Sequence, residues 1–502
     1  MTLTVLPHRD RLGVGTTRLL IDGAWCDAAS GETVPHVHPA TNEELAQVAV
    51  ATAEDVSRAV GAARRAFDDG AWTSMVARER MRLMRRVAAL IEAHAEELTD
   101  LQVLDNGLPR SFGSIYQLSV DMVVDIFEHH AGWIDRIAGQ TLPDHTGEAW
   151  FPLTVREPVG VVAAILPWNA PLMLFAQKVA PALAAGCTVV LKPSEYASLV
   201  TVRLTELLVE AGVPDGVVNL VTGPPDPTGE ALITDPRVDK ISFTGSRAVG
   251  TRMLHASAER IGRTSLELGG KSPNIVFADA DVDAVASVAM GMVSMGLSGQ
   301  GCVCHTRVLV EESIHDELVE KAAAMAAMST YGDPFDDGVT SAALINARQL
   351  AKVEGLIASA LEQGATAVVG GDRPGGDLAA GNFVNPTLFA GVTNDMRIAR
   401  EEVFGPVLAV IPFRDEAEAI RLANDTEYGL GASVHTKDVR RAFRVAKAVR
   451  AGTFGVNGYT VMPNVPFGGY KASGLGREGG HEGIDAFLET KTIMVNLNEQ
   501  PF

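Results

Sequence analysis

The chain has little cysteine, few aromatic residues and a shortage of basic side chains. Its 4 cysteines are too few for a disulfide framework in 502 residues, which favours a reducing, cytoplasmic setting. Its 62 acidic residues against 42 basic ones give a net charge of −20, which opposes binding to nucleic acid or an anionic membrane. No apolar run is long enough to span a bilayer. Because the N-terminus lacks the apolar segment of a signal peptide, residues 1–17 are predicted to be a flexible tail.

The rest of the composition is typical of a soluble globular protein, with 47% hydrophobic and 21% charged residues. The chain is too long for a single core, so two or three substructures are expected. No linker rich in serine or proline, no internal repeat and no metal-ligand spacing stands out, and we expect no catalytic metal.

Apolar spacing predicts the elements of the N-terminal part. Residues 21–26 (IDGAWC) are typical of a short strand and turn. Thr52 and Asp55 form a candidate capping box at the start of a helix. Residues 78–104 have the spacing of one long amphipathic helix.

From residue 159 onward, strands and helices alternate. The continuous apolar run 159–166 indicates a strand covered on both faces. A helix from Pro171 to Gly186 follows, and the alternation continues with strands at 187–192, 217–221 and 239–243 and helices at 198–211 and 227–234. A second series runs from 274 to about 470. This order predicts an α/β fold with doubly wound parallel sheets.

Two strand ends carry candidate nucleotide-binding residues. In FTGSRAVG (243–250), Gly245 permits a tight turn, and Ser246 with the first free amides of a helix could donate to a phosphate; an ordinary helix cap explains the pattern equally well. In LKPSE (191–195), Lys192 and Glu195 could face a ribose, and a carboxylate there favours NAD over NADP; a solvated ion pair is the alternative. GLGREG (474–479) matches a dinucleotide fingerprint by letter only, because no βαβ unit surrounds it.

The stretch MGLSGQGCVCHTR (295–307) places two cysteines in a loop of small residues. Most free thiols are buried and inert, so Cys302 and Cys304 alone predict little. Glu267 in ELGGKSP and Asn169 in ILPWNAP, however, each follow a predicted strand. Thiol, carboxylate and amide together supply a nucleophile, a base and an oxyanion donor for acyl-transfer chemistry. An extended loop would direct Cys304 away from the site, so it is expected to pack in the interior.

The motifs ILPWNAP, KPSE, FTGS, ELGGKSP, GQGC, EEVFGP (401–406) and PFGGYKASGLGREGG (466–480) occur in this order between 165 and 480. Together they resemble the aldehyde dehydrogenase superfamily, in its non-acylating, hydrolytic branch. The resemblance implies a variant Rossmann cofactor domain (1–138 and 157–267), a catalytic domain (268–480) and a small β oligomerisation flap (139–156 and 481–502). The expected assembly is a homodimer or homotetramer, because an exposed edge strand at 487–497 needs a partner; pairing within its own subunit is the alternative.

The resemblance also implies individual roles. Cys302 attacks the aldehyde, Asn169 and the Cys302 amide stabilise the oxyanion, and Glu267 activates the water that hydrolyses the thioester. Lys178 and Glu478 match a proposed proton path. The implied NAD site, which could also take NADP, comprises Ile165, Trp168, Lys192, Ser194, Glu195, Phe243, Gly245, Ser246, Leu268, Glu402 and Phe404.

The expected substrate pocket is wide and apolar. Its small members are Ala170, Gly301 and Val303, and no Lys or Arg stands out to hold a substrate carboxylate. We therefore expect a medium or bulky hydrophobic or aromatic aldehyde. The other pocket positions are Met173, Gln177, Val461, Met462 and Phe467.

Three alternatives stay open at this stage. A CoA-acylating enzyme usually lacks the glutamate that stands here as Glu267. A non-catalytic relative can lose the nucleophile or base, yet Cys302, Glu267 and Asn169 are all present. A redox pair of Cys302 and Cys304 is disfavoured, because one intervening residue would strain the disulfide.

Overall fold

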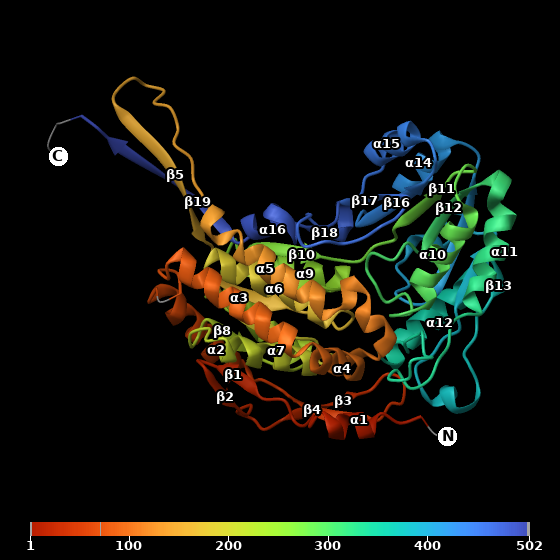
Figure 1. Cartoon of the computed structure of the whole chain (residues 1–502), viewed down its shortest axis with the longest axis horizontal. Coiled ribbons are helices and arrows are strands. Elements are labelled where there is room, and N and C mark those ends of the chain that lie inside the picture. The colour runs from red at the N-terminus through yellow and green to blue at the C-terminus, as the bar shows by residue number, and fades with distance from the viewer. Residues whose placement is uncertain (1–2, 71, 499–502) are drawn as a thin grey trace.

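Two mainly parallel sheets organise the computed structural model, which describes residues 3–70 and 72–498 (Figure 1). The α/β fold predicted from the alternation of strands and helices is confirmed. The first sheet has the order β18 (Gly474–Leu475), β10 (Arg263–Glu267), β9 (Lys240–Thr244), β6 (Val161–Ile165), β7 (Thr188–Lys192), β8 (Val218–Leu220), β1 (Leu19–Ile21) and β2 (Ala24–Cys26). The second has the order β13 (Thr366–Val369), β14 (Thr387–Ala390), β15 (Val407–Phe413), β12 (Arg307–Glu311), β11 (Pro273–Val276), β16 (Gly431–His435) and β17 (Thr453–Val456).

The centre of the first sheet is buried on both faces, as its apolar strands require. Strands β10, β9, β6, β7 and β8 run parallel, whereas β18 at one edge pairs antiparallel with β10, and β1 pairs antiparallel with both β8 and the edge strand β2. Alternate residues of β6 face opposite cores: Ala163 lies in one cluster and Val162 in the other. The first face is covered by α2 (Ala53–Asp68), α8 (Glu230–Thr234) and α9 (Arg247–Ala258). The second is covered by α3 (Ala77–Ala93), α4 (Ala95–Asn106), α5 (Val120–Ala131), α6 (Pro171–Ala185) and α7 (Leu199–Glu210).

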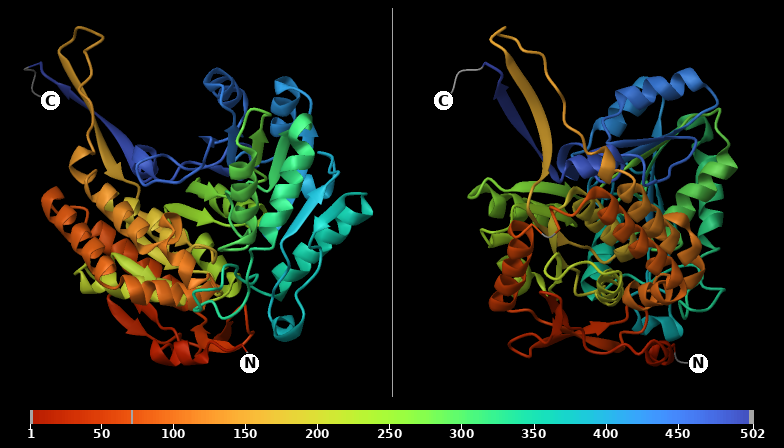
Figure 2. Two further views of the ribbon diagram at one scale, coloured as in Figure 1. Left: turned by 45° about the vertical axis from the view of Figure 1, so that its right-hand side comes forward. Right: turned by 60° about the vertical axis from the view of Figure 1, so that its left-hand side comes forward.

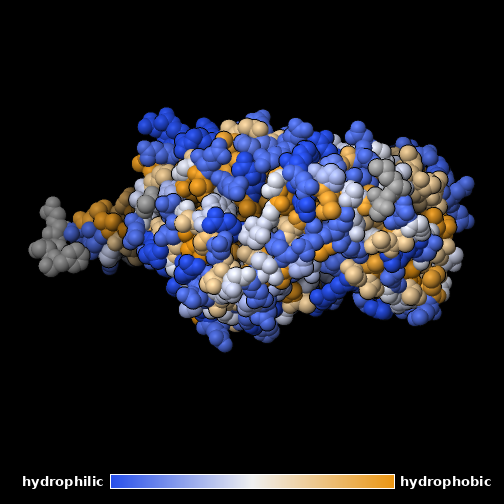
Figure 3. Space-filling view, turned by 90° about the horizontal axis from the view of Figure 1, so that it is seen from below, coloured by the Kyte–Doolittle hydropathy of each residue, from blue (hydrophilic) through white to orange (hydrophobic). Residues whose placement is uncertain are grey.

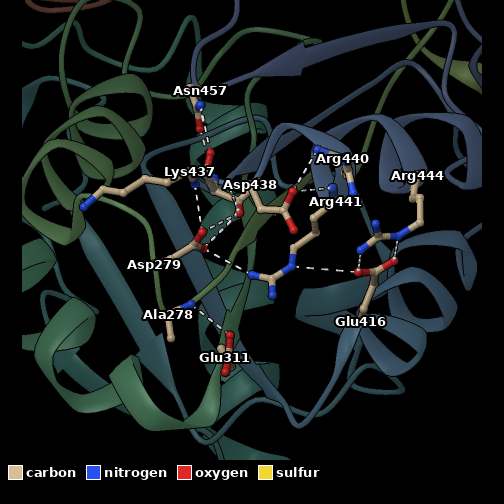
Figure 4. A network of polar contacts seen from close by, with 11 residues as sticks. Ala278, Asp279, Glu311, Glu416, Lys437, Asp438, Arg440, Arg441, Arg444 and Asn457 are labelled. Atoms are coloured by element: carbon tan, nitrogen blue, oxygen red, sulfur yellow. Dashed lines mark hydrogen bonds and ion pairs between the residues drawn. The ribbon is translucent and has the colours of Figure 1, made fainter.

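The second sheet is covered in the same way. One face carries α12 (Ala347–Glu362), α13 (Arg397–Arg400), α14 (Glu416–Asn424) and α15 (Val439–Ala448), and the other carries α10 (Val282–Ser294) and α11 (His315–Ala326). Beyond the end of β11, Asp279 accepts hydrogen bonds from the Lys437 backbone N–H and the Arg441 guanidinium, and Arg444 pairs with Glu416 (Figure 4). These contacts fasten α15 to the end of the sheet.

A two-stranded ribbon projects from the body of the molecule (Figures 1 and 2). It pairs β5 (Trp150–Pro158) with β19 (Leu488–Asn496), which follows the short helix α16 (Gly480–Asp485). The last strand therefore finds a partner within its own chain, the alternative left open by the sequence. A further small sheet pairs β3 (Thr33–Val37) with β4 (Glu44–Ala49).

Two expectations about local structure were wrong. Residues 3–17 are not a loose tail: α1 (Leu6–Arg11) follows the fully buried Val5, and the His8 ring stacks on Phe335 at 3.8 Å; residues 1–2 lie outside the described residues. The single helix expected at 78–104 is two helices, because His94 adopts φ −109° and ψ 22° between α3 and α4. The break lets α3 pack on α5 while α4 packs on α7.

Other boundaries follow the sequence closely. The capping box of Thr52 and Asp55 is present at the start of α2. One short segment crosses the expected domain division: Gly474 and Leu475 form β18, which joins the first sheet beside β10. Within the described residues, no helix is long and apolar enough to cross a membrane.

Candidate active site

The cysteine loop follows α10 and is held by two other segments of the chain. Gln300 donates to the Ala343 carbonyl at 3.1 Å and accepts from the Ile345 N–H at 2.9 Å, so its side chain ties the loop to residues 343–345. Gly299 has φ +72° and lies against the Gly405 carbonyl, where any Cβ would collide. The loop is therefore fixed by specific contacts although its residues are small.

Cys302 lies in this loop and lines a cavity. Burial raises the pKa of its thiol, and the nearby Glu402 and Glu267 raise it further because they oppose a thiolate. The backbone N–H of Cys302 faces its own sulfur and acts in the opposite direction. The raised pKa favours the protonated thiol, which needs a base, or an added positive charge nearby, to become a nucleophilic thiolate.

Asn169 follows β6 and lies at the same cavity. The side-chain Nδ2 of Asn169 donates to the Gln300 backbone carbonyl at 2.9 Å. The backbone carbonyl of Asn169 accepts from Asn106 Nδ2 at 2.9 Å. The amide group is therefore positioned between the first sheet and the cysteine loop, with one N–H left for a ligand.

Glu267 ends β10 beside Thr244 of β9. Its side chain is 3% exposed, and Oε2 has no hydrogen-bond partner among the described residues. Burial raises the pKa of this carboxyl well above its ordinary value, the nearby Glu478 raises it further, and Lys178 acts in the opposite direction. A carboxyl of raised pKa with a free oxygen is suited to accept a proton near neutral pH.

Lys178 and Glu478 are brought together as a buried ion pair. The ammonium lies 2.5 Å from Glu478 Oε1 and 3.5 Å from the Ser242 hydroxyl. The pair connects α6 to the segment before α16, close enough to Glu267 to influence its charge.

The expected cofactor residues gather at the carboxyl ends of the first sheet, where open α/β sheets bind ligands. Lys192 ends β7 and is buried, which lowers the pKa of its ammonium to about 8, and its Nζ donates to the Pro193 carbonyl. Glu195 is half-buried nearby. Ser246 caps α9, accepting from the Val249 N–H at 3.4 Å. Ile165, Phe243 and Leu268 form part of the apolar cluster beneath this edge.

Glu402 and Phe404 approach the same edge from the second sheet. Glu402 Oε1 accepts from the Gly270 N–H at 3.1 Å, and the preceding Gly269 lies so close to this carboxylate that a Cβ would overlap it. The Phe404 ring meets Trp168 edge-on at 5.3 Å between centroids. Carboxylates, a buried ammonium and free helix amides along one sheet edge are the donor set that a dinucleotide requires, so the residues present fit NAD.

The cavity behind these groups measures about 440 Å³ and is largely apolar. Of the predicted pocket residues, all but Met462 line it; Met462 is 41% exposed and points away, since it follows Val461 directly. Residues 301–304 form a turn, with the Cys304 N–H bonded to the Gly301 carbonyl, and not the extended loop that was expected. Cys304 is among the residues that line the cavity, and it packs against the core of the second sheet, as expected from the sequence.

Sequence reasoning missed several residues of the site. Lys352 on α12 lies near Glu402, and Gln349 donates to the Phe404 carbonyl. No local motif marks either residue. A helix-period repeat could have identified one wall of the cavity, because Val288, Met292 and Met295 recur at that spacing. The segment 112–118 contributes Phe112, Ile115, Gln117 and Leu118.

Comparison with known proteins agrees with this geometry. The family model described as "Aldehyde dehydrogenase family" matches residues 25–493. The chain belongs to the aldehyde dehydrogenase family. It is 43% identical to aldehyde dehydrogenase family 2 member B4, mitochondrial, of Arabidopsis thaliana, covering 97% of this chain and 89% of that protein.

Two further relatives of this aldehyde dehydrogenase bear on substrate and cofactor. The benzaldehyde dehydrogenase, mitochondrial, of Antirrhinum majus is 42% identical over 98% of this chain and 91% of its own. The crystal structure of betaine aldehyde dehydrogenase from Staphylococcus aureus in complex with NAD+ superposes with a TM-score of 0.95 at 37% identity, covering 99% and 98% of the two chains. The predicted fold and enzyme class are confirmed, and the predicted cofactor agrees with the NAD+ in that structure.

Proposed function

We propose that this enzyme oxidises a medium or bulky hydrophobic or aromatic aldehyde to its carboxylic acid with NAD and water. One observation carries the proposal: a thiol, a carboxylate and an amide line a single, largely apolar cavity. These three groups supply nucleophile, base and oxyanion donor.

In the proposed reaction, Cys302 gives up its thiol proton to bulk water and attacks the aldehyde carbon as a thiolate, while Glu267 stays ionised for the later step. Asn169 Nδ2 and the Cys302 backbone N–H donate to the oxygen, which carries negative charge in the thiohemiacetal. NAD, when bound, accepts the hydride that leaves this carbon, and a thioester on Cys302 remains. Glu267 then takes a proton from water, the hydroxide adds to the thioester, and the acid leaves as Cys302 is released.

The residues present also support the preference for NAD. Glu402 and Lys352 would bind the ribose next to the nicotinamide, whereas Lys192 and Glu195 would face the adenosine ribose. Because Glu195 is negative and only half-buried, it would repel a 2′-phosphate. Trp168 and Phe404 form the apolar boundary of the nicotinamide side.

The walls of the cavity support the choice of substrate. No Lys or Arg lines it within the part of the chain that the structure describes, so a substrate carboxylate would lack a counter-charge. Met173, Met292 and Phe467 instead offer apolar surface and adaptable shape.

A panel of aldehydes tests this proposal. We expect NADH formation, followed at 340 nm, to be faster with benzaldehyde or octanal than with acetaldehyde by about 10- to 100-fold in kcat/KM, because each buried methylene contributes ~0.8 kcal/mol. NAD should be preferred over NADP, and added CoA should not accelerate turnover. A preference for acetaldehyde or for a semialdehyde acid would contradict the substrate class; dependence on CoA would contradict the hydrolytic reaction.

We also propose that the ribbon mediates self-association. Its side chains Met494 and Val495 are exposed, and Figure 3 shows apolar surface on the projection. A two-stranded ribbon still has free edges that favour pairing with another sheet. The four cysteines are free, as in the reducing, cytoplasmic location proposed here; fractionation of cells would test it.

A charged ribbon tests the assembly. We expect the wild type to sediment as a dimer or tetramer and the double variant Met494→Asp/Val495→Asp as a monomer of 53.1 kDa, because two charges would be buried in the interface. Asn496→Asp adds one negative charge at the exposed strand end and should leave the assembly intact. Light scattering after gel filtration measures all three. A double variant of unchanged mass would place the interface elsewhere.

A further inference from the structure

The wall of the substrate cavity contains one amide without a partner. Gln177 lies on α6 and lines the cavity, and its side chain is 3% exposed. Its Oε1 is shut off from solvent and accepts no hydrogen bond from any described residue, and its Nε2 donates none to them either. An unpaired amide at this depth is costly unless something that enters the cavity completes it.

The other polar side chains of the cavity already have roles. Asn169, Thr244, Glu267 and Cys302 form the reacting end. Away from that end, Gln117 Nε2 donates to the Thr460 hydroxyl at 2.6 Å, and the Tyr459 hydroxyl lies 2.7 Å from that of Thr453. Cys304 Sγ lies 3.7 Å from the Met292 carbonyl. The Thr244 hydroxyl and Glu267 Oε2 also have no hydrogen-bond partner among the described residues, but both lie at the reacting end; away from that end, Gln177 is the polar wall residue of the described chain that is left without one.

We infer that Gln177 binds a hydroxyl group of the substrate, so that the preferred aldehydes carry a hydroxyl remote from the carbonyl. This inference rests on the proposed function. A half-turn about the terminal side-chain bond exchanges the carbonyl oxygen and the NH2 of the amide. A hydroxyl can donate to the carbonyl oxygen or accept from the NH2 group, so it can pair with the amide in either orientation.

The surroundings disfavour a cationic donor. An ammonium group would need a counter-charge, and Glu267 at the reacting end is the one carboxylate lining the cavity in the described chain. The place of Gln177 on α6 also limits where the hydroxyl lies on the substrate. Gln177 lies six positions after Pro171, the residue that starts α6 next to Asn169 and Ala170. Six positions of an α-helix correspond to about 9 Å along the helix axis. The hydroxyl is thus expected on the far side of a ring or at the end of a chain.

The test compares each hydroxylated aldehyde with an apolar analogue of similar size. The 2-, 3- and 4-hydroxybenzaldehydes are paired with the methylbenzaldehydes, and 8-hydroxyoctanal with nonanal. The hydroxyl-to-methyl ratio of kcat/KM is measured in the wild type and in Gln177→Met, which keeps the side-chain volume but removes the amide. Comparing the two ratios cancels the intrinsic reactivity of each aldehyde.

We expect Gln177→Met to reduce this ratio by roughly 10- to 100-fold for the 3- or 4-hydroxy isomer and little for the 2-hydroxy isomer, because the variant lacks a buried hydrogen-bond partner. An effect with 8-hydroxyoctanal alone would identify an aliphatic alcohol as the source of the hydroxyl. Gln363→Met makes the same change at an exposed amide outside the cavity, where Oε1 accepts from the Arg397 N–H, and should leave the ratio unchanged.

Equal ratios in wild type and Gln177→Met would overturn the inference and mean that solvent satisfies the amide. A larger effect with the 2-hydroxy isomer would contradict the position derived from α6. These results differ from failure of the proposed function, in which neither methylbenzaldehydes nor hydroxybenzaldehydes would yield NADH.

Discussion

Replacing Cys302 with alanine is expected to reduce aldehyde oxidation by at least about 10⁴-fold, because the covalent route through the thioester is lost with the nucleophile. The protein should remain folded: a half-buried side chain loses one sulfur atom next to an existing cavity. NADH formation at 340 nm measures the activity, and thermal unfolding with and without NAD checks folding and cofactor binding.

The neighbouring thiol provides the matched control. Cys304 lines the same cavity, two residues away, and its sulfur lies near the Met292 carbonyl rather than among the acidic residues. Cys304→Ala should therefore retain activity within a few-fold. If Cys304→Ala were inactive and Cys302→Ala active, the nucleophile would be reassigned and the role of the loop with it. Loss in both variants would point to a structural requirement of the turn.

The second large effect is expected from Glu267→Gln. Without the general base, hydrolysis of the thioester should slow by about 10²- to 10⁴-fold. If the thiolate still forms, one equivalent of NADH per active subunit should appear in a rapid burst, followed by slow turnover. Stopped-flow absorbance distinguishes the phases, and mass spectrometry detects the acyl group on Cys302. Because glutamine has nearly the same shape, the cavity should keep its volume.

The dependence of turnover on pH tests the role of Glu267 independently. The pKa of Glu267 is raised, so its carboxylate, the form that accepts a proton, is lost as pH falls through that raised value. Turnover of the wild type should therefore decline on the acid side well above the ordinary range of a glutamate. Glu206→Gln, at a surface carboxylate paired with Arg203, should leave both burst and profile unchanged. A Glu267→Gln enzyme without a burst would place Glu267 earlier, as the group that deprotonates Cys302.

Most of the fold could be predicted because its signals are local. The buried strand β6 is a continuous apolar run, and the start of α2 is specified by its capping box. The break at His94 could not be predicted, since no Gly or Pro marks it and the two helices differ in what they pack against, α3 mainly on α5 and α4 mainly on α7. The N-terminal helix depends on Phe335, a residue far away in the chain.

The site residues also differ in whether a local motif marks them or only the tertiary structure brings them together. Glu267 and Asn169 stand at strand ends within recognisable motifs, so sequence could nominate them. Lys352 comes close to Glu402 only in the tertiary structure. Val461 is buried whereas its neighbour Met462 is exposed, a difference that the sequence does not indicate. The backbone at Cys304 forms a turn where an extended loop was expected. Contacts made at long range and directions of single side chains are what the sequence leaves open.

The cavity also separates two kinds of residue by the elements that carry them. The reacting groups stand on strand ends and on a loop fixed by Gln300, whereas most of the apolar wall comes from helix surfaces, from residues 112–118 and from residues 459–467. Substitutions in the wall leave the strand ends in place. Variation confined to positions such as 115, 173, 177 and 292 would therefore redirect substrate choice while the chemical step persists, which makes these positions a natural target for directed evolution of new aldehyde selectivities.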